Sequence, residues 1–484
     1  MQASNLDIAS WLQQQVVDAK ISQAEFNFTL WLNFAASEFR NGTLQLARNE
    51  LHWQVGQQRH QLVIPKGLMR LRPQADGWLV NNNPLTFIQD SATWTLPTMS
   101  WLQTPEQTVL SANEVPVAPL VQLASLAGST GQAWAEKLQQ SKLRGVLDLR
   151  MQRKLDEPMN WQIQGHNLAW QGHEQIPAVA EIDINLVGQG STARWQVFGE
   201  QVALQSQWLD STAPWQLAKL NVSGEFAWPA DPQSETRWQL RIADGSRVEL
   251  AGLPLEVRAT LRQSEQLEVA ARVIADTRTP VDATVLRRYL PEVMGASLHD
   301  YLQTALLEAK AESITMLWRG AVEEFPYTQQ QGVFRAQATL RDLVYKFQPN
   351  WPSVTEASAY VHFGNERMHI RAEDAALLDM GLPQVDTVLP DLTARPPQLL
   401  ISGSIAGDGS ALQPVFAQSP LASSLGKTFE ELQLRGPLTG RLALTIPLDN
   451  SGEVIAEGYG DLNNNTLNVT SLGQRFAQVS GRIR

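Results

Sequence analysis

The segment Leu253 to Arg262 alternates between apolar and polar side chains at nearly every position. A period of two is typical of a β-strand with one apolar face and one face in water. The same alternation recurs along most of the 484 residues. Further examples are Ile182–Ile184–Leu186, Trp238–Leu240–Ile242, Leu267–Val269–Ala271–Val273 and Leu442–Leu444–Ile446–Leu448. A chain that forms sheet with one apolar face along most of its length has a large apolar surface. What this surface contacts decides the function of the protein.

Strand patterns dominate the chain, and two helical insertions interrupt them, at 116–143 and 282–311. The second insertion has apolar side chains at i, i+3, i+4 spacing: Leu298, Tyr301, Leu302, Ala305, Leu306 and Ala309. From Ile314 to the end the pattern predicts strands again. No linker, low-complexity run or short repeat divides the chain. We therefore expect 1–484 to form one continuous, elongated, mainly β structure, in which each helical insertion covers either the apolar surface or a sheet edge.

Charge and composition exclude several classes of protein. The net charge is −11 and the isoelectric point is about 5.2, so the chain lacks the basic face that binding to nucleic acid requires. The same charge argues against adhesion to anionic lipid headgroups. The absence of cysteine excludes disulfides, thiolate catalysis and cysteine-ligated zinc.

The two ends of the sequence indicate a piece of a longer protein. The first residues, Met1 to Asp7, lack the basic and apolar regions of a signal peptide. The least polar stretch, Val115 to Ala135, contains prolines, glycines and polar residues and is no membrane span. The last residues, Phe476 to Arg484, end within a strand pattern.

Catalytic motifs are scarce, so we expect a protein that is not an enzyme and has no cofactor. The seven histidines form no His-Glu-x-x-His motif, and no Gly-x-Ser-x-Gly elbow occurs. His362 and His369 are an odd number of residues apart, which on one regular strand places them on opposite faces and excludes a metal pair. The acidic doublets are Glu323-Glu324, Glu373-Asp374 and Glu430-Glu431. Because neighbouring residues of a strand lie on opposite faces, we interpret the doublets as solvated residues rather than as an acid/base pair.

One block of aromatic, glycine and proline residues is more specific than the rest. Its order is Tyr289-Leu-Pro291, Tyr301-Leu302, Trp318-Arg-Gly320, Phe325-Pro-Tyr327, Gly332-x-Phe334 and Tyr345-x-Phe347-x-Pro349-x-Trp351-Pro352. Ser419-Pro-Leu421 and Gly440-Arg-Leu442 to Leu448 follow. As an ordered series this block resembles the YhdP family of the AsmA-like superfamily, which is related to TamB. The resemblance covers most of the chain and makes 314–484 the family-typical C-terminal part.

This resemblance implies a fold, a location and a role. It implies a long, twisted and curled antiparallel β-sheet that forms a half-open groove in the periplasm of Gram-negative bacteria. The family's proteins are anchored in the inner membrane by a helix that this chain lacks. They are associated with moving phospholipids between the inner and outer membranes and with the outer-membrane permeability barrier. Outer-membrane or other envelope proteins are possible partners.

If the apolar face lines such a groove, its partner is the acyl chain of a phospholipid. Each methylene that leaves water for an apolar wall contributes about 0.8 kcal/mol, and no directional chemistry is needed. The residues predicted to line the groove are those that lie on the apolar face of their strands. They are Ile182, Ile184, Leu186, Trp238, Leu240, Ile242, Leu255, Val257, Leu261, Val269, Val273, Leu442, Leu444 and Ile446.

Two other hypotheses stay open at this point. In the first, the apolar faces pack sheet on sheet in a multi-domain β-sandwich scaffold or adhesion protein of the envelope. It requires turn-rich domain boundaries about every hundred residues, which the sequence does not show. In the second, the 16 tryptophans are sugar platforms of a carbohydrate-active protein. It requires paired carboxylates at a cleft, and none is evident.

Overall fold

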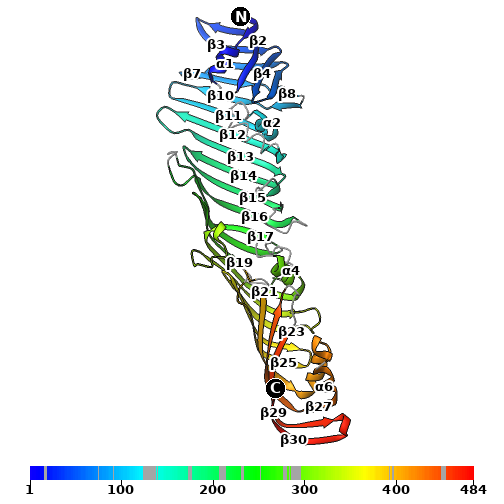
Figure 1. Ribbon diagram of the computed structural model, residues 1–484. Coiled ribbons are helices and arrows are strands. Elements are labelled where there is room, and N and C mark those ends of the chain that lie inside the picture. Colours follow the sequence, from blue (N-terminus) through cyan, green and yellow to red (C-terminus); the bar gives the residue numbers. More distant parts are fainter. Residues whose placement is uncertain are drawn as a thin grey trace. The chain divides into compact units, whose positions relative to one another are not determined.

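The computed structural model (Figure 1) describes residues 1–15, 19–74, 76–90, 92–123, 138, 140–172, 177–205, 214–229, 234–250, 252–275, 281–282, 284, 296–391, 393–394, 397–423, 425–448 and 454–484. The chain divides into two compact units, with the boundary between Arg241 and Ile242. The described strands belong to one antiparallel sheet of 30 strands, which confirms the predicted mainly β fold. Each unit is described by itself below.

The first unit consists of short N-terminal strands followed by a regular ladder. Its strands are β1 (Gln2–Asp7), β2 (Lys20–Ala35), β3 (Glu38–Leu46), β4 (Asn49–Val55), β5 (Gln58–Ile64), β6 (Gly67–Gln74), β7 (Gly77–Asn82), β8 (Leu85–Gln89), β9 (Ala92–Leu96), β10 (Met99–Gln103), β11 (Gln107–Pro116), β12 (Arg144–Lys154), β13 (Asn160–Trp170), β14 (Ala178–Gln189), β15 (Thr192–Gln205) and β16 (Trp215–Ala227). Its helices are α1 (Ala9–Gln15) and α2 (Val117–Leu123). Strand β17 (Trp238–Leu250) crosses the boundary between the units.

The ladder from β10 to β16 pairs each strand with the next one in the sequence, and Figure 1 shows these strands lying side by side. Before the ladder, β2 pairs with β3 along its C-terminal half and with β4 along its N-terminal half. One branch continues through β6 and β7 to β10, and the other through β5 to β8 and β9. The regular ladder is therefore the continuation of the branch that contains β6 and β7.

Bulges interrupt several of these strands near one end, and a carboxylate on the neighbouring strand completes the hydrogen bonding of each. Glu114 in β11 and Asn167 in β13 have positive φ angles, 56° and 51°, and lie at shifts of register. The backbone N–H of Glu114 donates to Asp148 Oδ1 at 2.7 Å, and that of Asn167 donates to Asp183 Oδ1 at 2.8 Å. Bulges bend a strand and increase its twist, so these acidic residues stabilise a bent sheet.

The second unit is also a ladder of strands, and the described part of it includes three helices at the ends of strands. Its strands are β18 (Leu253–Gln263), β19 (Leu267–Ala275), β20 (Val281–Asp282), β21 (Leu306–Ala321), β22 (Val333–Tyr345), β23 (Val354–Gly364), β24 (Arg367–Leu377), β25 (Met380–Leu389), β26 (Gln398–Asp408), β27 (Leu432–Arg435), β28 (Pro437–Pro447), β29 (Ile455–Val469) and β30 (Gln474–Ile483). Its helices are α4 (Ala296–Ala305), α5 (Leu412–Ala417) and α6 (Leu425–Glu431). Within the residues that the structure describes, this unit has 3₁₀ turns at Val322–Glu324, Gly409–Ala411, Pro420–Ser423 and Thr470–Leu472.

The helical predictions are correct only in part. In the first insertion, helix α2 covers Val117–Leu123, and most of the remainder, 124–137 and 139, lies outside the described residues. In the second insertion, α4 ends at Ala305, and strand β21 begins at Leu306. The helical prediction for 306–311 is therefore wrong. In the structure Ala309 and Ala311 are buried and Lys310 is exposed, which is the period of two of a strand. The prediction failed because the apolar residues here fit both the strand period and the helical spacing.

Helices α5 and α6 correct a second prediction, since the sequence pattern from Ile314 onward predicted only strands. In α5 the buried residues Leu412, Val415 and Phe416 follow i, i+3, i+4 spacing. The rings of Phe416 and Phe429 stack with centroids 5.3 Å apart and join the two helices. Both helices lie between β26 and β28, strands that pair directly, so they are an insertion at one end of the ladder.

The part of the aromatic block from Trp318 to Phe334 forms a packed turn between β21 and β22. The Tyr327 side chain is buried, and its hydroxyl donates to the carbonyl of Ala321 at 2.9 Å and accepts from Trp318 Nε1 at 2.6 Å. Its ring lies against Gly320 and Gly332, where an added Cβ would come within 2.9 Å and 2.5 Å of ring carbons. Packing around Tyr327 therefore explains Trp318, Gly320 and Gly332 of the block.

Candidate functional site: an apolar face and its cavity

One face of the second unit is apolar across ten strands in register. Directly paired residues share a face of a sheet. The pairings join Leu255, Ala275, Ile314, Ala338, Val361, Ile370, Thr387, Ile401, Leu444 and Ala456 in one row. A second row joins Val281, Ala311, Leu340, Ala359, Ala372, Val385, Gly403 and Leu442. We call the face that carries these rows the inner face.

The opposite face, the outer face, is largely polar. One of its rows joins Glu256, Ile274, Thr315, Gln337, His362, His369, Val388, Leu400 and Thr445. Next to this row, Asp386 lies 3.0 Å from Arg371 Nε and 2.8 Å from His369 Nε2. The hydrogen bonds from Gln384, His369 and Arg371 outweigh the effect of burial and lower the pKa of Asp386. The outer face is therefore a solvated, ion-paired surface.

The inner face lines a partly open cavity of about 220 Å³. Its wall is formed by Leu302, Leu306, Ala338, Leu340, Leu343, Tyr345, Phe347, Trp351, Val354, Ala357, Val361, Phe363, Met368, Ile370, Ala372, Leu377, Leu382, Val385, Thr387, Ile401, Gly403, Ile405, Leu442 and Leu444. None of these wall residues carries a charge. An apolar cavity of comparable size, about 150 Å³, stays dry and binds apolar guests, so this wall suits hydrocarbon.

The cavity also shows that the sheet is curled in this unit. Ala338 on β22 and Leu442 on β28 both line it, although five strand-to-strand steps separate them. In a flat sheet those steps would span about 24 Å. Strands this far apart in the order of pairing line one cavity, as expected for a curled sheet.

Polar groups of the wall gather where β22 ends. Tyr345 is the last residue of β22 and pairs with Leu306 and Val354. Its hydroxyl donates to the hydroxyl of Tyr301, on α4, at 2.7 Å. Burial is the main reason why the pKa of both tyrosines is raised, so both hydroxyls stay neutral. Trp351 follows in the loop between β22 and β23 and is 2% exposed.

The first unit has an apolar face of its own, which is more accessible to solvent and which we call the inner face of the first unit. One row joins Met99, Ala112, Leu149, Ile163, Leu186 and Trp195, and a second joins Val115, Leu147, Gly165, Ile184, Val197 and Val222. Leu149, Ile163 and Leu186 are only half-buried. Since a face packed against a second sheet would bury these residues, the β-sandwich hypothesis is not favoured.

Tryptophans of the first unit cover glycines on the neighbouring strand. Trp161 is paired with Gly188, where an added Cβ would lie 2.1 Å from the indole ring. Trp195 is paired with Gly224, and the corresponding distance is 2.8 Å. Aromatic side chains that lie over cross-strand glycines protect the exposed backbone. These two tryptophans are thus part of the apolar surface itself.

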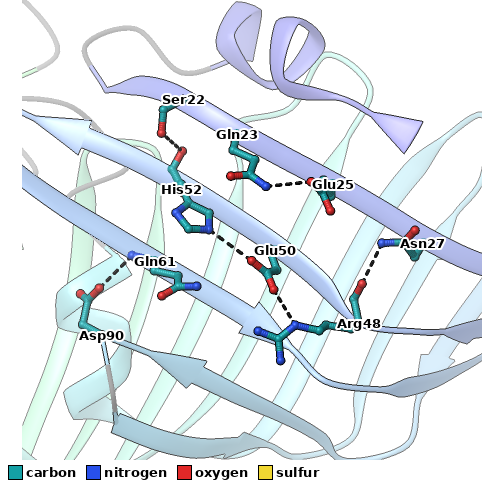
Figure 2. Close-up of polar contacts among 9 residues, drawn as sticks. All are labelled: Ser22, Gln23, Glu25, Asn27, Arg48, Glu50, His52, Gln61 and Asp90. Atoms are coloured by element: carbon teal, nitrogen blue, oxygen red, sulfur yellow. Dashed lines mark hydrogen bonds and ion pairs between the residues drawn. The ribbon is translucent and has the colours of Figure 1, made fainter. Parts of the chain in front are cut away.

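The polar face of the N-terminal strands contains ion pairs and hydrogen bonds. Figure 2 shows Glu50 between Arg48, whose Nε lies at 2.5 Å, and His52, whose Nε2 lies at 3.4 Å. The hydrogen bond from Arg48 is the main reason why the pKa of Glu50 is lowered. On the other face of the same strand, Trp53 and Val55 are buried. This cluster is the solvated side of a strand.

The predicted groove residues lie at four places in the structure. Leu442 and Leu444 line the cavity, and Ile446 is buried in the surrounding core. Leu255, Val257, Leu261, Val269 and Val273 lie on the inner face of β18 and β19, where Val257 pairs with Val273 and Leu261 with Val269. Ile182, Ile184 and Leu186 lie on the inner face of β14. Trp238, Leu240 and Ile242 are half-buried on β17, and Trp238 contacts Phe226 with ring centroids 6.2 Å apart.

Sequence reasoning missed the part of the wall that comes from β22 to β26 and from α4. The alternation of Ala357, Ala359, Val361 and Phe363 was a signal that could have found β23. The grouping of Tyr301, Tyr345 and Trp351 had no local signal, because it depends on contacts between separate segments.

One prediction about histidines is wrong. His362 and His369 are directly paired on β23 and β24 and so share the outer face. They lie on two strands joined by a hairpin, for which the dipeptide Gly364-Asn365 is a sequence signal. Among the described residues, no group of three or more His, Cys, Asp or Glu side chains is arranged to hold a metal ion. Of the helices in the described residues, none is long and apolar enough to cross a membrane.

The fold and the cavity define a class of one-sided β-sheet proteins with an apolar inner face. The chain belongs to the family described as YhdP protein, whose family model matches residues 1–484. It is 26% identical over 514 residues to the intermembrane phospholipid transporter YhdP of Escherichia coli (strain K12). That match covers 100% of this chain and 39% of the relative, so the chain spans well under half of that protein. No solved structure matches this chain.

Proposed function

We propose that residues 1–484 are a periplasmic segment of an inner-membrane-anchored protein that moves phospholipids between the inner and outer membranes. The acyl chains lie against the inner face, and the polar headgroup stays in water. The outer-membrane permeability barrier depends on this transport, and envelope proteins at the two ends are its partners. The protein acts without catalysis, because transport along a wall requires only a continuous apolar surface.

The observation that carries this proposal is the uncharged cavity within an inner face that is apolar across ten strands. Hydrocarbon gains about 0.8 kcal/mol per methylene on entering such a wall, and it needs no hydrogen-bond partner there. The name of the E. coli relative, a phospholipid transporter, supports the same ligand. The predicted groove residues of β18, β19 and β28 share the face that lines the cavity, which supports their assignment to the lipid path.

Lipid mass spectrometry on the purified chain tests the proposal. Extracts of the unmodified chain should contain phospholipid, and the triple variant Leu255→Asp, Val257→Asp, Leu261→Asp should lose most of it because three carboxylates interrupt the wall. A charge-matched control is Thr260→Asp, Ile274→Asp, Thr315→Asp, three positions of the outer face, and it should retain the lipid. A folded chain that carries no phospholipid would contradict the proposal.

A further inference from the structure

One margin of the inner face of the first unit is rich in aromatic side chains. The pairings join Trp101, Leu110, Met151, Trp161, Gly188, Ala193 and Phe226 in one row, which we call the aromatic row. It lies next to the strand ends, since Trp161 is the second residue of β13 and Phe226 is the second-last residue of β16. The ring of Trp161 lies over Gly188. Phe226 contacts Trp228 and Trp238, with ring centroids 5.6 Å and 6.2 Å apart.

This margin is accessible to water although its side chains are large. Trp101 is 46% exposed and Trp228 is 36% exposed. A tryptophan side chain has an apolar body and a polar N–H, and such side chains are enriched where hydrocarbon meets water. Exposed tryptophans at the margin of an apolar face therefore indicate a boundary between an apolar ligand and water.

The inner face becomes more polar, row by row, toward this margin. In β10, β11 and β12 the central row contains Met99, Ala112 and Leu149, and the aromatic row contains Trp101, Leu110 and Met151. The next row, which we call the polar row, contains Gln103, Thr108 and Arg153. Successive rows are two residues apart along each strand, which is about 6.6 Å. The order apolar, aromatic and polar is also the order of acyl chain, glycerol ester and phosphate in a glycerophospholipid.

The polar row has a positive charge that suits a phosphate. Arg153 is exposed, and it forms no ion pair with any residue that the structure describes. The neighbouring Lys154 pairs with Glu157 at 3.4 Å. The planar guanidinium group of arginine matches the geometry of phosphate oxygens, so Arg153 is available to a lipid headgroup.

We propose that these three rows fix the orientation of a glycerophospholipid on the first unit. The acyl chains lie on the central row, the glycerol ester lies at the aromatic row, and the phosphate lies at the polar row beside Arg153. Trp101 and Trp161 are positioning residues, because their rings cover the start of the acyl chains. This inference rests on the proposed function and adds an orientation to it, in which the headgroup leaves the inner face at the strand ends that carry Gln103 and Arg153.

Photoreactive phospholipids with the reactive group at two depths test this orientation. One phosphatidylcholine probe carries a diazirine near the ester, and its isomer carries the diazirine at the end of the acyl chain. Digestion and mass spectrometry of the irradiated, purified chain locate the labelled residues. The ratio of near-ester to end-of-chain labelling is taken at each residue, so that differences in side-chain reactivity cancel. This ratio should be at least about threefold higher in the aromatic row than in the central row, as expected for one favourable contact.

Variants of the aromatic row test the tryptophans. The double variant Trp101→Leu, Trp161→Leu keeps apolar side chains but loses both indoles, so the difference between the rows should fall below about twofold. The control is Trp31→Leu. Trp31 is 51% exposed and lies on the outer face, in the row that contains Ser100, so this variant should keep the full difference.

Variants of the polar row test the phosphate. Arg153→Glu should reduce labelling by the near-ester phosphatidylcholine probe at least about threefold, because it replaces an attractive charge by a repulsive one. It should not reduce labelling by a diacylglycerol that carries the same diazirine and lacks the phosphate. Arg150 is exposed on the outer face of the same strand, so Arg150→Glu should leave labelling by both lipids unchanged.

The outcomes separate this inference from the proposed function. Equal ratios in the two rows of the unmodified chain, or a higher ratio in the central row, overturn the orientation and leave lipid binding intact. A full difference in the double variant overturns the role of the tryptophans. An equal effect of Arg153→Glu on phosphatidylcholine and diacylglycerol overturns the position of the phosphate. Failure of every probe to label the inner face contradicts the proposed function itself. If the double variant does not fold, Trp101→Leu, at an exposed position, decides the result.

Discussion

Replacing Ile401 by Asp is expected to reduce the phospholipid bound to the second unit at least tenfold. Ile401 lines the cavity between Thr387 and Leu444. A carboxylate there has no counter-charge among the wall residues, and burying it costs several kcal/mol. Since 1.4 kcal/mol corresponds to a factor of ten in affinity, even a part of the cost of burying the carboxylate lowers the affinity for lipid at least tenfold. Lipid extraction followed by mass spectrometry measures the ratio of lipid to protein.

The adjacent residue provides the control for this prediction. Leu400 belongs to the same strand but lies on the outer face and is 38% exposed, so Leu400→Asp should change the bound lipid by less than about twofold. Ala338→Phe narrows the cavity without adding charge and should also lower occupancy, which separates filling of the cavity from disruption of the sheet. Equal lipid content in Leu400→Asp and Ile401→Asp would show that the cavity is not the binding site.

Replacing Tyr327 by Ala is expected to destabilise the second unit by roughly 3–5 kcal/mol, the range for removing a large buried aromatic side chain. Tyr327 is 1% exposed and contacts Gly320 and Gly332. The substitution also removes the acceptor of Trp318 Nε1 and the donor to Ala321. Thermal unfolding followed by circular dichroism should show a transition at clearly lower temperature.

Tyr360 is the matched control for the packing of Tyr327. It lies on the outer face of β23 and is 44% exposed, so Tyr360→Ala should cost no more than about 0.5 kcal/mol. Tyr327→Phe should fall between the two, because it keeps the ring and loses only the hydroxyl. If Tyr327→Ala and Tyr360→Ala lower the unfolding temperature equally, Tyr327 does not stabilise the turn between β21 and β22 as described.

The sequence was sufficient to predict the sheet and the face on which each alternating residue lies, because a period of two is a local property. The positions of Leu442, Leu444 and Val257 on the apolar face of the sheet were predicted in this way. Local patterns failed where two periods overlap, as at Ala309 and Ala311. They also failed where a short helix is inserted between paired strands, as for Phe416 in α5.

The cavity itself could not be predicted from the sequence. It depends on how far the sheet curls, and the curl follows from bulges and pairings between residues distant in the sequence. The hydrogen bond between the hydroxyls of Tyr301 and Tyr345 also depends on a long-range contact, because the two residues are 44 positions apart. Their grouping with Trp351 is a property of the folded second unit alone.

The central claim is that lipid contacts the inner face and not the outer face, and site-specific photo-cross-linking in cells tests it most directly. A photoreactive amino acid is placed at Val361 or at Leu186, both on the inner face, and at the neighbouring outer positions Tyr360 and Val187, which are 44% and 46% exposed. The inner positions should yield cross-linked phospholipid in both units, and the outer positions should yield little. Equal cross-linking at inner and outer positions, or none at Val361 and Leu186, would contradict the claim.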